Sequence, residues 1–77
     1  MPFRELRTNE QILAHEVRLI DDQNIQLGVL SQEAAQRIAR EKGLDLVEVA
    51  PQANPPVCRL LDYDRYKFET IRREEGR

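Results

Sequence analysis

The sequence predicts an α+β fold (α/β-like): a mixed four-stranded β-sheet, one packed α-helix and a C-terminal linker helix, in the order ββαββα. Three observations favour this class. Two pairs of short β-type runs flank an alanine-rich helical segment, turn residues separate the runs, and residues 63–77 are charged almost throughout. A chain of 77 residues makes one small domain with a thin core, because a domain this small buries only about 60% of the surface that its unfolded form exposes.

The first two strands are predicted ahead of residue 30. Residues 17–20 form a short β-type run, and residues 21–24 follow as a turn, because Asp and Asn side chains bond to nearby backbone and Asn tolerates positive φ. Residues 25–29 alternate with period two, which is typical of a half-buried strand. Its apolar side consists of Ile25, Leu27 and Val29.

An N-terminal arm precedes these strands, and a helix follows them. The arm has no clear period, and we expect Leu6, Ile12 and Leu13 to dock it onto the domain. Ser31 is a good helix N-cap, and Gly43 stands where a left-handed glycine ends a helix. Between them one helical stripe is nearly all alanine, so the helix should lie close against a sheet. The stripe contains Ala34, Ala35, Ile38 and Ala39.

The second pair of strands covers residues 44–50 and 57–61. Adjacent Leu46 and Val47 predict burial on two faces and a central strand. The strand–helix–strand unit over residues 25–49 predicts a right-handed crossover between parallel strands, with antiparallel hairpin neighbours. Residues 51–56 contain three prolines, which lack the donors of a ladder. This loop is either a stiff epitope or a plain connection.

The final helix is predicted from about Tyr63, with Asp62 as its cap. Its apolar stripe fades after Tyr63, Tyr66 and Ile71. A helix that is polar all round bridges domains, depends on charge pairs or frays. We therefore expect the domain to span residues 1–69 and an interdomain linker helix to begin at residues 70–77.

Composition excludes several protein classes. The net charge of −2 provides no overall attraction to nucleic acid, so local patches must supply any such attraction. A single cysteine, Cys58, cannot close an intrachain disulfide. Apolar runs are far shorter than the roughly 20 residues that span a bilayer, and the N-terminus lacks a signal-peptide pattern. These features favour a cytoplasmic protein without a membrane partner.

Catalytic and metal sites are disfavoured by the residue inventory. His15 is the only histidine and is expected on the surface, and Cys58 is expected as a small core residue. Neither has a visible partner for nucleophilic catalysis. The Asp21-Asp22 pair is read as a solvated hairpin tip rather than a cation site, since the ligand spacing of a Ca²⁺ loop is missing. No cofactor or small-molecule substrate is expected.

A basic and aromatic cluster near the C-terminus is the best binding candidate. RNA recognition combines cations that meet phosphates with rings that stack on unpaired bases. The alternative is an ordinary surface, because acidic residues alternate with the basic ones, and Tyr63 and Phe68 could simply anchor the helix. Arg37 and Arg40 form a second, weaker candidate on the first helix. The cluster comprises Arg59, Tyr63, Arg65, Tyr66, Lys67, Phe68, Arg72, Arg73 and Arg77.

Several segments together resemble the N-terminal domain of bacterial translation initiation factor 3. Residues 45–51 read DLVEVAP, residues 55–63 read PPVCRLLDY, and residues 65–69 read RYKFE. Upstream, NEQI at residues 9–12, EVRLID at residues 16–21 and QLGV at residues 26–29 resemble the same domain in order and spacing. Two positions depart from the pattern: Asn24 where the family often has Gly, and Asp64 where Gly or a small polar residue is usual.

The resemblance implies a non-enzymatic, monomeric factor that acts on the small (30S) ribosomal subunit. Such factors assist initiator tRNA and start-codon selection and keep the large subunit away, with the main subunit-binding activity in a second domain. The accessory domain reaches toward 16S ribosomal RNA, ribosomal proteins and the initiator tRNA. An alternative is a protein-interaction module with little RNA contact. The contacts that the resemblance implies are Arg59, Tyr63, Arg65, Tyr66, Lys67, Arg72 and Arg73.

Overall fold

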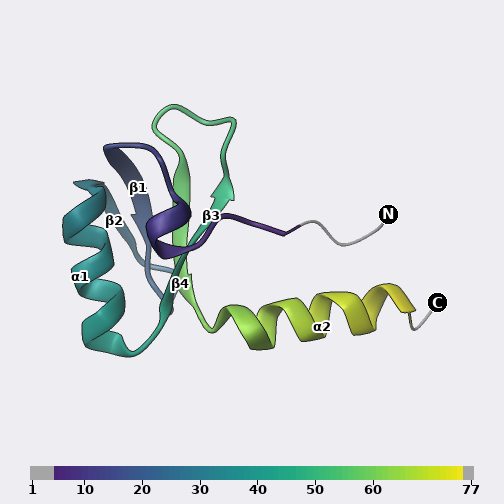
Figure 1. The fold of residues 1–77 in the computed structure, drawn as a ribbon. Coiled ribbons are helices and arrows are strands. Elements are labelled where there is room, and N and C mark those ends of the chain that lie inside the picture. The colour runs from purple at the N-terminus through teal and green to yellow at the C-terminus, as the bar shows by residue number, and fades with distance from the viewer. Residues whose placement is uncertain (1–4, 76–77) are drawn as a thin grey trace.

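The computed structural model describes the backbone of residues 5–75 and the side chains of residues 5–71. The predicted ββαββα order is confirmed, preceded by one short 3-10 helix (Figure 1). In chain order the elements are η1 (Asn9–Gln11), β1 (Glu16–Ile20), β2 (Gln26–Ser31), α1 (Gln32–Lys42), β3 (Asp45–Ala50), β4 (Val57–Leu61) and α2 (Tyr63–Glu75).

The four strands form one mixed sheet in the order β2-β1-β4-β3. The β1–β2 and β3–β4 pairs are antiparallel, and the central β1–β4 pair is parallel. It follows that β2 and β3 run in the same direction, as predicted, although they lie at opposite edges of the sheet. The two antiparallel hairpins are therefore joined side by side through their inner strands.

Strand β3 is an edge strand, which corrects the prediction of a central one. Leu46 and Val47 are nonetheless both fully buried, so the expected burial on two faces is confirmed. The N-terminal arm accounts for this burial. Thr8 forms a bridge with Val47, and the Glu48 N–H donates to the Arg7 carbonyl at 2.9 Å. The N-terminal arm, which is distant in sequence, therefore covers the outer edge of β3.

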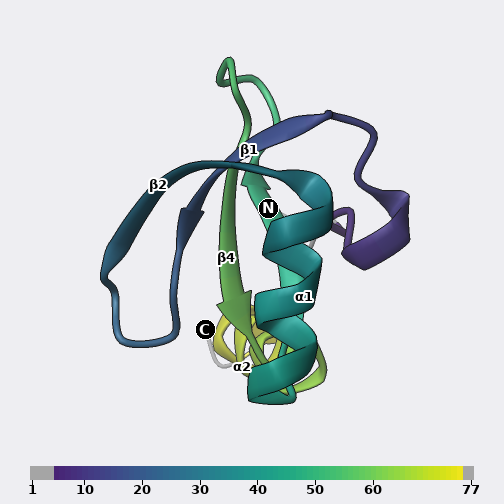
Figure 2. The same ribbon diagram turned by 90° about the vertical axis from the view of Figure 1, so that its left-hand side faces the viewer.

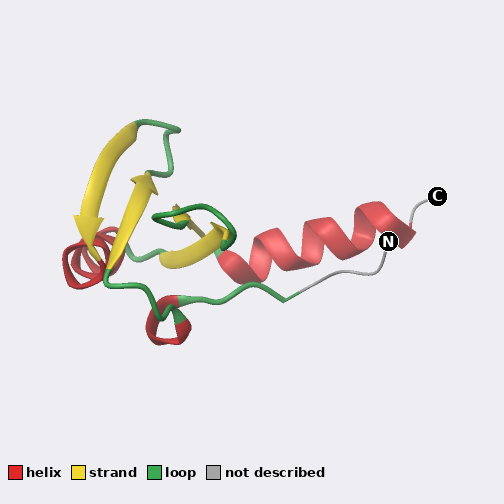
Figure 3. Cartoon of the chain, turned by 90° about the horizontal axis from the view of Figure 1, so that it is seen from above, coloured by secondary structure: helices red, strands yellow, loops and turns green. Residues whose placement is uncertain are grey.

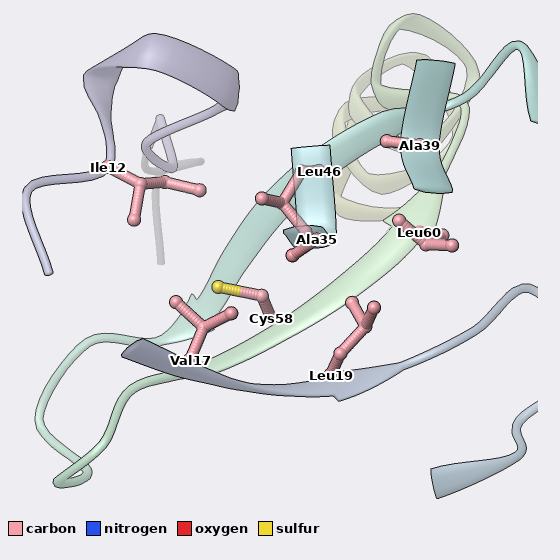
Figure 4. Close-up of a cluster of buried hydrophobic side chains, with 8 residues drawn as sticks. All are labelled: Ile12, Val17, Leu19, Ala35, Ala39, Leu46, Cys58 and Leu60. Atoms are coloured by element: carbon pink, nitrogen blue, oxygen red, sulfur yellow. The ribbon is translucent and has the colours of Figure 1, made fainter. Parts of the chain in front are cut away.

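Helix α1 covers one face of the sheet (Figure 2). The Ser31 hydroxyl accepts the Ala34 N–H, and Gly43 ends the helix in the left-handed region with φ 69°, as predicted. Ala35 and Ala39 are buried, and their small side chains let the helix lie close to the strands. Figure 4 shows the core side chains gathered between the helix and the sheet: Ile12, Val17, Leu19, Leu46, Cys58 and Leu60.

The apolar side of β2 faces solvent, contrary to the sequence-based expectation. Ile25, Leu27 and Val29 are 52%, 39% and 43% exposed. Pairing register explains the difference: Leu30 lies opposite the buried Val17. Because side chains alternate along a strand, the register decides which set enters the core. A register shift between Leu19 and Ile20 also interrupts the pairing.

The β1–β2 turn is closed by a buried carboxylate. The Asp21 side chain accepts the N–H groups of Gln23 at 2.9 Å and Ile25 at 2.8 Å. Asn24 adopts φ 66°, as its residue type predicts. The interpretation of Asp21 as a solvated tip is therefore wrong, since its side chain is buried beneath the turn that it caps.

The arm docks through fewer residues than expected. Ile12 enters the core and Leu6 is half-buried, but Leu13 is 77% exposed. The Gln32 amide holds the arm by donating to the carbonyls of Ile12 at 2.6 Å and Ala14 at 2.7 Å. These main-chain contacts orient Leu13 away from the core side of the arm, because neighbouring side chains of an extended chain point in opposite directions.

Candidate nucleic-acid interface

Helix α2 leaves the body on the side of the sheet away from α1 (Figure 3). Two carboxylates meet its first turn. The Asp62 side chain accepts the Arg65 N–H at 3.3 Å, which confirms the predicted cap, and the Asp45 side chain accepts the Tyr63 N–H at 3.1 Å. Negative charge at this end matches the positive end of the helix dipole. The helix start is therefore held by polar groups.

The two tyrosines of the chain stack on each other in the first turns of α2. Their ring centroids are 6.1 Å apart, with 23° between the ring planes. Tyr63 is half-buried and its hydroxyl accepts the Leu6 N–H at 2.8 Å, whereas Tyr66 lies at the surface. Phe68 is 64% exposed, so the interpretation of Phe68 as an anchor is wrong. Among the described aromatic side chains of α2, Tyr63 is the one that is hydrogen-bonded to the N-terminal arm.

The two described cations of α2 are paired with exposed carboxylates. Arg65 Nε lies 3.0 Å from Glu69 one turn further on. Lys67 pairs with Glu5 of the N-terminal arm, and this hydrogen bond raises the pKa of Lys67 above its usual range. Exposed pairs of this kind contribute little to stability and exchange readily for other partners. Both cations thus remain available to an anionic ligand.

Arg59, on strand β4, lies near the first turns of α2. Its guanidinium donates to the Asn24 side chain at 3.1 Å. Arg59 and Tyr66 line a hollow of about 440 Å³ at the junction of β4 and α2. Arg65 and Tyr66 line an adjoining hollow of about 370 Å³. The structure therefore brings Arg59, Arg65 and Tyr66 together.

The remaining candidates are placed differently. Tyr63 and Lys67 contact the N-terminal arm rather than these hollows. Arg72 and Arg73 lie in α2, but their side chains are outside the described part of the chain, as is Arg77 altogether. The predicted cluster is thus divided between two sides of the helix. Helical geometry accounts for the division, because Tyr63 and Lys67 are one turn apart, whereas Arg65 points elsewhere.

The catalytic and metal alternatives can be compared with the described residues only. Cys58 is fully buried, and burial, followed by the charge of Glu48, raises the pKa of its thiol to about 12. Such a thiol stays protonated and is a poor nucleophile. Within residues 5–71, no group of three His, Cys, Asp or Glu side chains is placed to hold a metal ion. No described helix is long and apolar enough to cross a membrane.

A family comparison covers most of the chain. The family model described as Translation initiation factor IF-3, N-terminal domain, matches residues 8–76. The chain belongs to this family. The match includes the arm from Thr8 onward, the whole sheet and α2.

Curated IF-3 relatives are similar over nearly the whole chain. The protein named Translation initiation factor IF-3 from Aquifex aeolicus is 54% identical over 72 residues, which is 94% of this chain and 41% of the relative. The protein of the same name from Nitratidesulfovibrio vulgaris (strain DP4) is 52% identical over 75 residues, or 97% of this chain and 43% of the relative. The chain spans about two fifths of the length of these relatives.

The IF-3 signature also contains structural residues that sequence reasoning did not single out. Asp45 opens the strand motif of residues 45–51 and bonds to the start of α2, and Asn9 opens the upstream motif and bonds to Asp45 at 3.3 Å. Their partners are 18 and 36 positions away. No local pattern in the sequence reveals hydrogen bonds between residues so far apart. The residue type at position 9 does fit the local backbone, because Asn9 has a positive φ (50°), a conformation that Asn adopts more readily than most residues.

Proposed function

We propose that this IF-3 domain binds the small (30S) ribosomal subunit through α2 and the adjoining end of β4. In the full-length factor it assists initiator tRNA and start-codon selection and contributes to preventing subunit association. It acts in the cytoplasm as a non-enzymatic monomer without a cofactor, and 16S ribosomal RNA and ribosomal proteins are its partners. The contact residues are Arg59, Tyr63, Arg65, Tyr66, Lys67, Arg72 and Arg73.

The observation that carries this proposal is the grouping of Arg59, Arg65 and Tyr66 at the base of a projecting helix. The guanidinium groups are suited to phosphate oxygens, and the exposed face of Tyr66 is suited to an unpaired base. The ring is already supported by its stacking on Tyr63. A base that stacks on Tyr66 would therefore meet a surface that needs little reordering.

The two carboxylates that pair with Arg65 and Lys67 do not oppose this proposal. Glu69 and Glu5 are exposed, and their pairs with Arg65 and Lys67 are of the weak surface type. A phosphate that replaces either carboxylate forms a new charge-assisted hydrogen bond. The freed Glu side chain returns to water at little cost. Binding would thus proceed by exchange of partners, although the net charge of the chain is −2.

The division of the chain into two parts is also a proposal. Residues 1–69 would form the domain, and residues 70–77 would begin the linker helix to the second domain of the factor. The relatives that match are more than twice as long as this chain. The continuity of α2 from Tyr63 to Glu75 supports a helical linker.

The salt dependence of binding to purified 30S subunits tests the proposal. We expect affinity to fall steeply as salt rises, because each phosphate contact releases condensed counterions. Replacing Arg65 and Lys67 by Glu should weaken binding and reduce the slope of log affinity against log salt by roughly two. The matched control replaces Arg37 and Arg40, two exposed cations of α1, by Glu. Equal losses from both pairs would contradict the choice of α2.

The exposed aliphatic residues of β2 favour a second candidate function. Leu27 and Val29 lie at the surface of the edge strand β2, and Ile25 lies exposed just before it. Aliphatic side chains at a surface are typical of protein contacts rather than of base stacking. The domain would then dock on a ribosomal protein with little RNA contact. A flat salt response combined with loss of binding in Leu27→Ser would favour this function over RNA recognition.

A further inference from the structure

Helix α2 is attached to the domain without a share in its core. Among the described side chains, the buried cluster and the residues packed around it come from the arm, the sheet, α1 and the loop after it. None belongs to α2 over the part of the chain whose side chains are described. Figure 3 shows the helix pointing away from the strands. The main apolar core therefore does not fix the direction in which α2 leaves the body, although Tyr66 lines the two hollows beside Leu60 and Leu61.

A segment of the N-terminal arm makes the contacts that packing does not provide. We name residues 5–9 the strap. Within it, the Leu6 N–H donates to the Tyr63 hydroxyl at 2.8 Å, and Glu5 pairs with Lys67 one turn further along α2. The two contacts join positions 57 and 62 residues apart. The strap therefore contacts α2 at two successive turns, and these two contacts constrain the direction of the helix.

The strap is itself fastened to β3. The Arg7 carbonyl accepts the Glu48 N–H at 2.9 Å, and the Arg7 guanidinium lies 3.4 Å from the buried Glu48 carboxylate. The Asn9 side chain accepts the Leu46 N–H at 3.0 Å. These contacts hold the strap against β3.

Asp45 links the strap directly to the start of α2. One carboxylate oxygen accepts from the Asn9 amide at 3.3 Å, and the other accepts the Tyr63 N–H at 3.1 Å. Both oxygens are therefore used, one for the strap and one for the helix. The carboxylate orients the first turn relative to β3, and the strap continues that orientation along the helix.

We propose that the strap and Asp45 position α2, and that they thereby set the separation between Arg65 on the helix and Arg59 on the sheet. Asn9 and Asp45 are positioning residues in this arrangement, because they act through Tyr63 and the helix start. The inference rests on the proposed function, since the spacing of the two arginines matters for binding to the 30S subunit. Without the strap, α2 samples many directions and only a fraction of molecules present the matching geometry.

Two variants loosen the strap while leaving the core unchanged. Tyr63→Phe removes the acceptor for Leu6 and keeps the ring stack. Asn9→Gly removes the bonds to Asp45 and Leu46 and tolerates the φ of 50° at that position. The matched control for the direction of α2 is Asn24→Gly, since Asn24 also has positive φ (66°) but lies in the β1–β2 turn, away from the strap. It does not serve as a control for affinity, because the Asn24 side chain accepts a hydrogen bond from Arg59.

Amide residual dipolar couplings compare the direction of α2 with that of the sheet in each purified chain. We expect reduced couplings for α2 in both strap variants and parent values in Asn24→Gly. Exchange of the Leu6 amide should accelerate about tenfold in Tyr63→Phe, in keeping with the loss of one hydrogen bond. Parent couplings for α2 in both strap variants would overturn the inference.

Affinity for purified 30S subunits tests the functional half. If Asn9→Gly lowers the fraction of molecules with the matching geometry to about one fifth, apparent affinity falls about fivefold. A reoriented α2 with parent affinity would show that positioning is irrelevant to binding, and would overturn the inference. Failure of the proposed function would give a different result. The variant with Arg65→Glu and Lys67→Glu would then bind 30S subunits with the affinity of the parent, whatever the dipolar couplings of α2 show.

Discussion

The two helices begin in the same way and are held in opposite ways. Ser31 caps α1 and Asp62 caps α2, each through a side-chain oxygen that accepts an N–H three residues on. Beyond this first turn they diverge. Helix α1 presses Ala35 and Ala39 against the sheet, whereas α2 projects from it and is tied by Asp45 and the strap (Figure 1).

The difference follows from the side chains that each helix presents to the sheet. Small apolar residues at helical spacing allow close approach and bury surface, which stabilises the fold as a whole. The first turns of α2 instead carry a tyrosine hydroxyl and two cations, whose polar partners lie in the N-terminal arm and in α2 itself rather than in the sheet. A helix held in this way contributes little to the core and keeps its outer surface for a partner.

A charge placed beneath α1 should produce the largest effect. Ala35→Glu buries an unpaired carboxylate, and we expect a loss of about 3–5 kcal/mol in the free energy of unfolding. Arg37→Glu introduces the same side chain on the exposed face of α1, where about 0.5 kcal/mol or less is typical. Urea denaturation followed by circular dichroism measures both. Similar midpoints for the two variants would mean that the packed face is wrongly assigned.

The thiol beneath α1 should make stability depend on alkaline pH. Burial raises the pKa of Cys58 from 9.0 to about 12, so the folded state keeps a proton that the unfolded state releases. The contribution of the thiol is complete below pH 9 and declines above it, by at most about 1.4 kcal/mol per pH unit. Urea midpoints at pH 8 and pH 10 should differ more in the parent than in Cys58→Ala. The same pH dependence in both proteins would exclude this role of Cys58.

Removing the N-cap of α1 should destabilise the whole domain, whereas removing the N-cap of α2 should affect mainly that helix. Ser31→Ala and Asp62→Ala each remove one cap, worth about 1 kcal/mol. We expect Ser31→Ala to lower the unfolding midpoint of the whole domain. Asp62→Ala should fray α2 with a smaller change in that midpoint. Both tyrosines lie in α2 and the chain has no tryptophan, so tyrosine fluorescence reports on α2 while circular dichroism reports on the whole chain. Coincident shifts of both signals in both variants would contradict the comparison.

Much of the fold was predictable because its signals are local. The cap at Ser31, the left-handed Gly43 and the alanine stripe between them specify α1, a helix of 11 residues, from local sequence alone. The turn at Asn24 and the last strand were placed by similar short-range rules. The candidate interface was predictable in residue type, but its division between two sides of α2 was not, because the helix start had to be located first.

The sequence-based expectations are wrong for the buried side of β2 and for the position of β3 in the sheet, because in both cases a segment distant in sequence decides the structure. Ile25, Leu27 and Val29 alternate as a core strand does, yet pairing with β1 turns them outward. Leu46 and Val47 are buried on both faces as a central strand would be, yet the arm rather than a further strand covers the edge of β3. In both cases the periodicity was real, and its meaning depended on a neighbour far away in sequence.

Local sequence features are enough to specify the order of elements, the packed face of α1 and the family to which the chain belongs. These follow from side-chain spacing, caps and motifs that act within a few residues. The tertiary structure alone decided the register of β2, the edge position of β3 and the direction of α2. Each of the three depends on hydrogen bonds between segments that come together only when the chain folds, and local spacing carries no record of them.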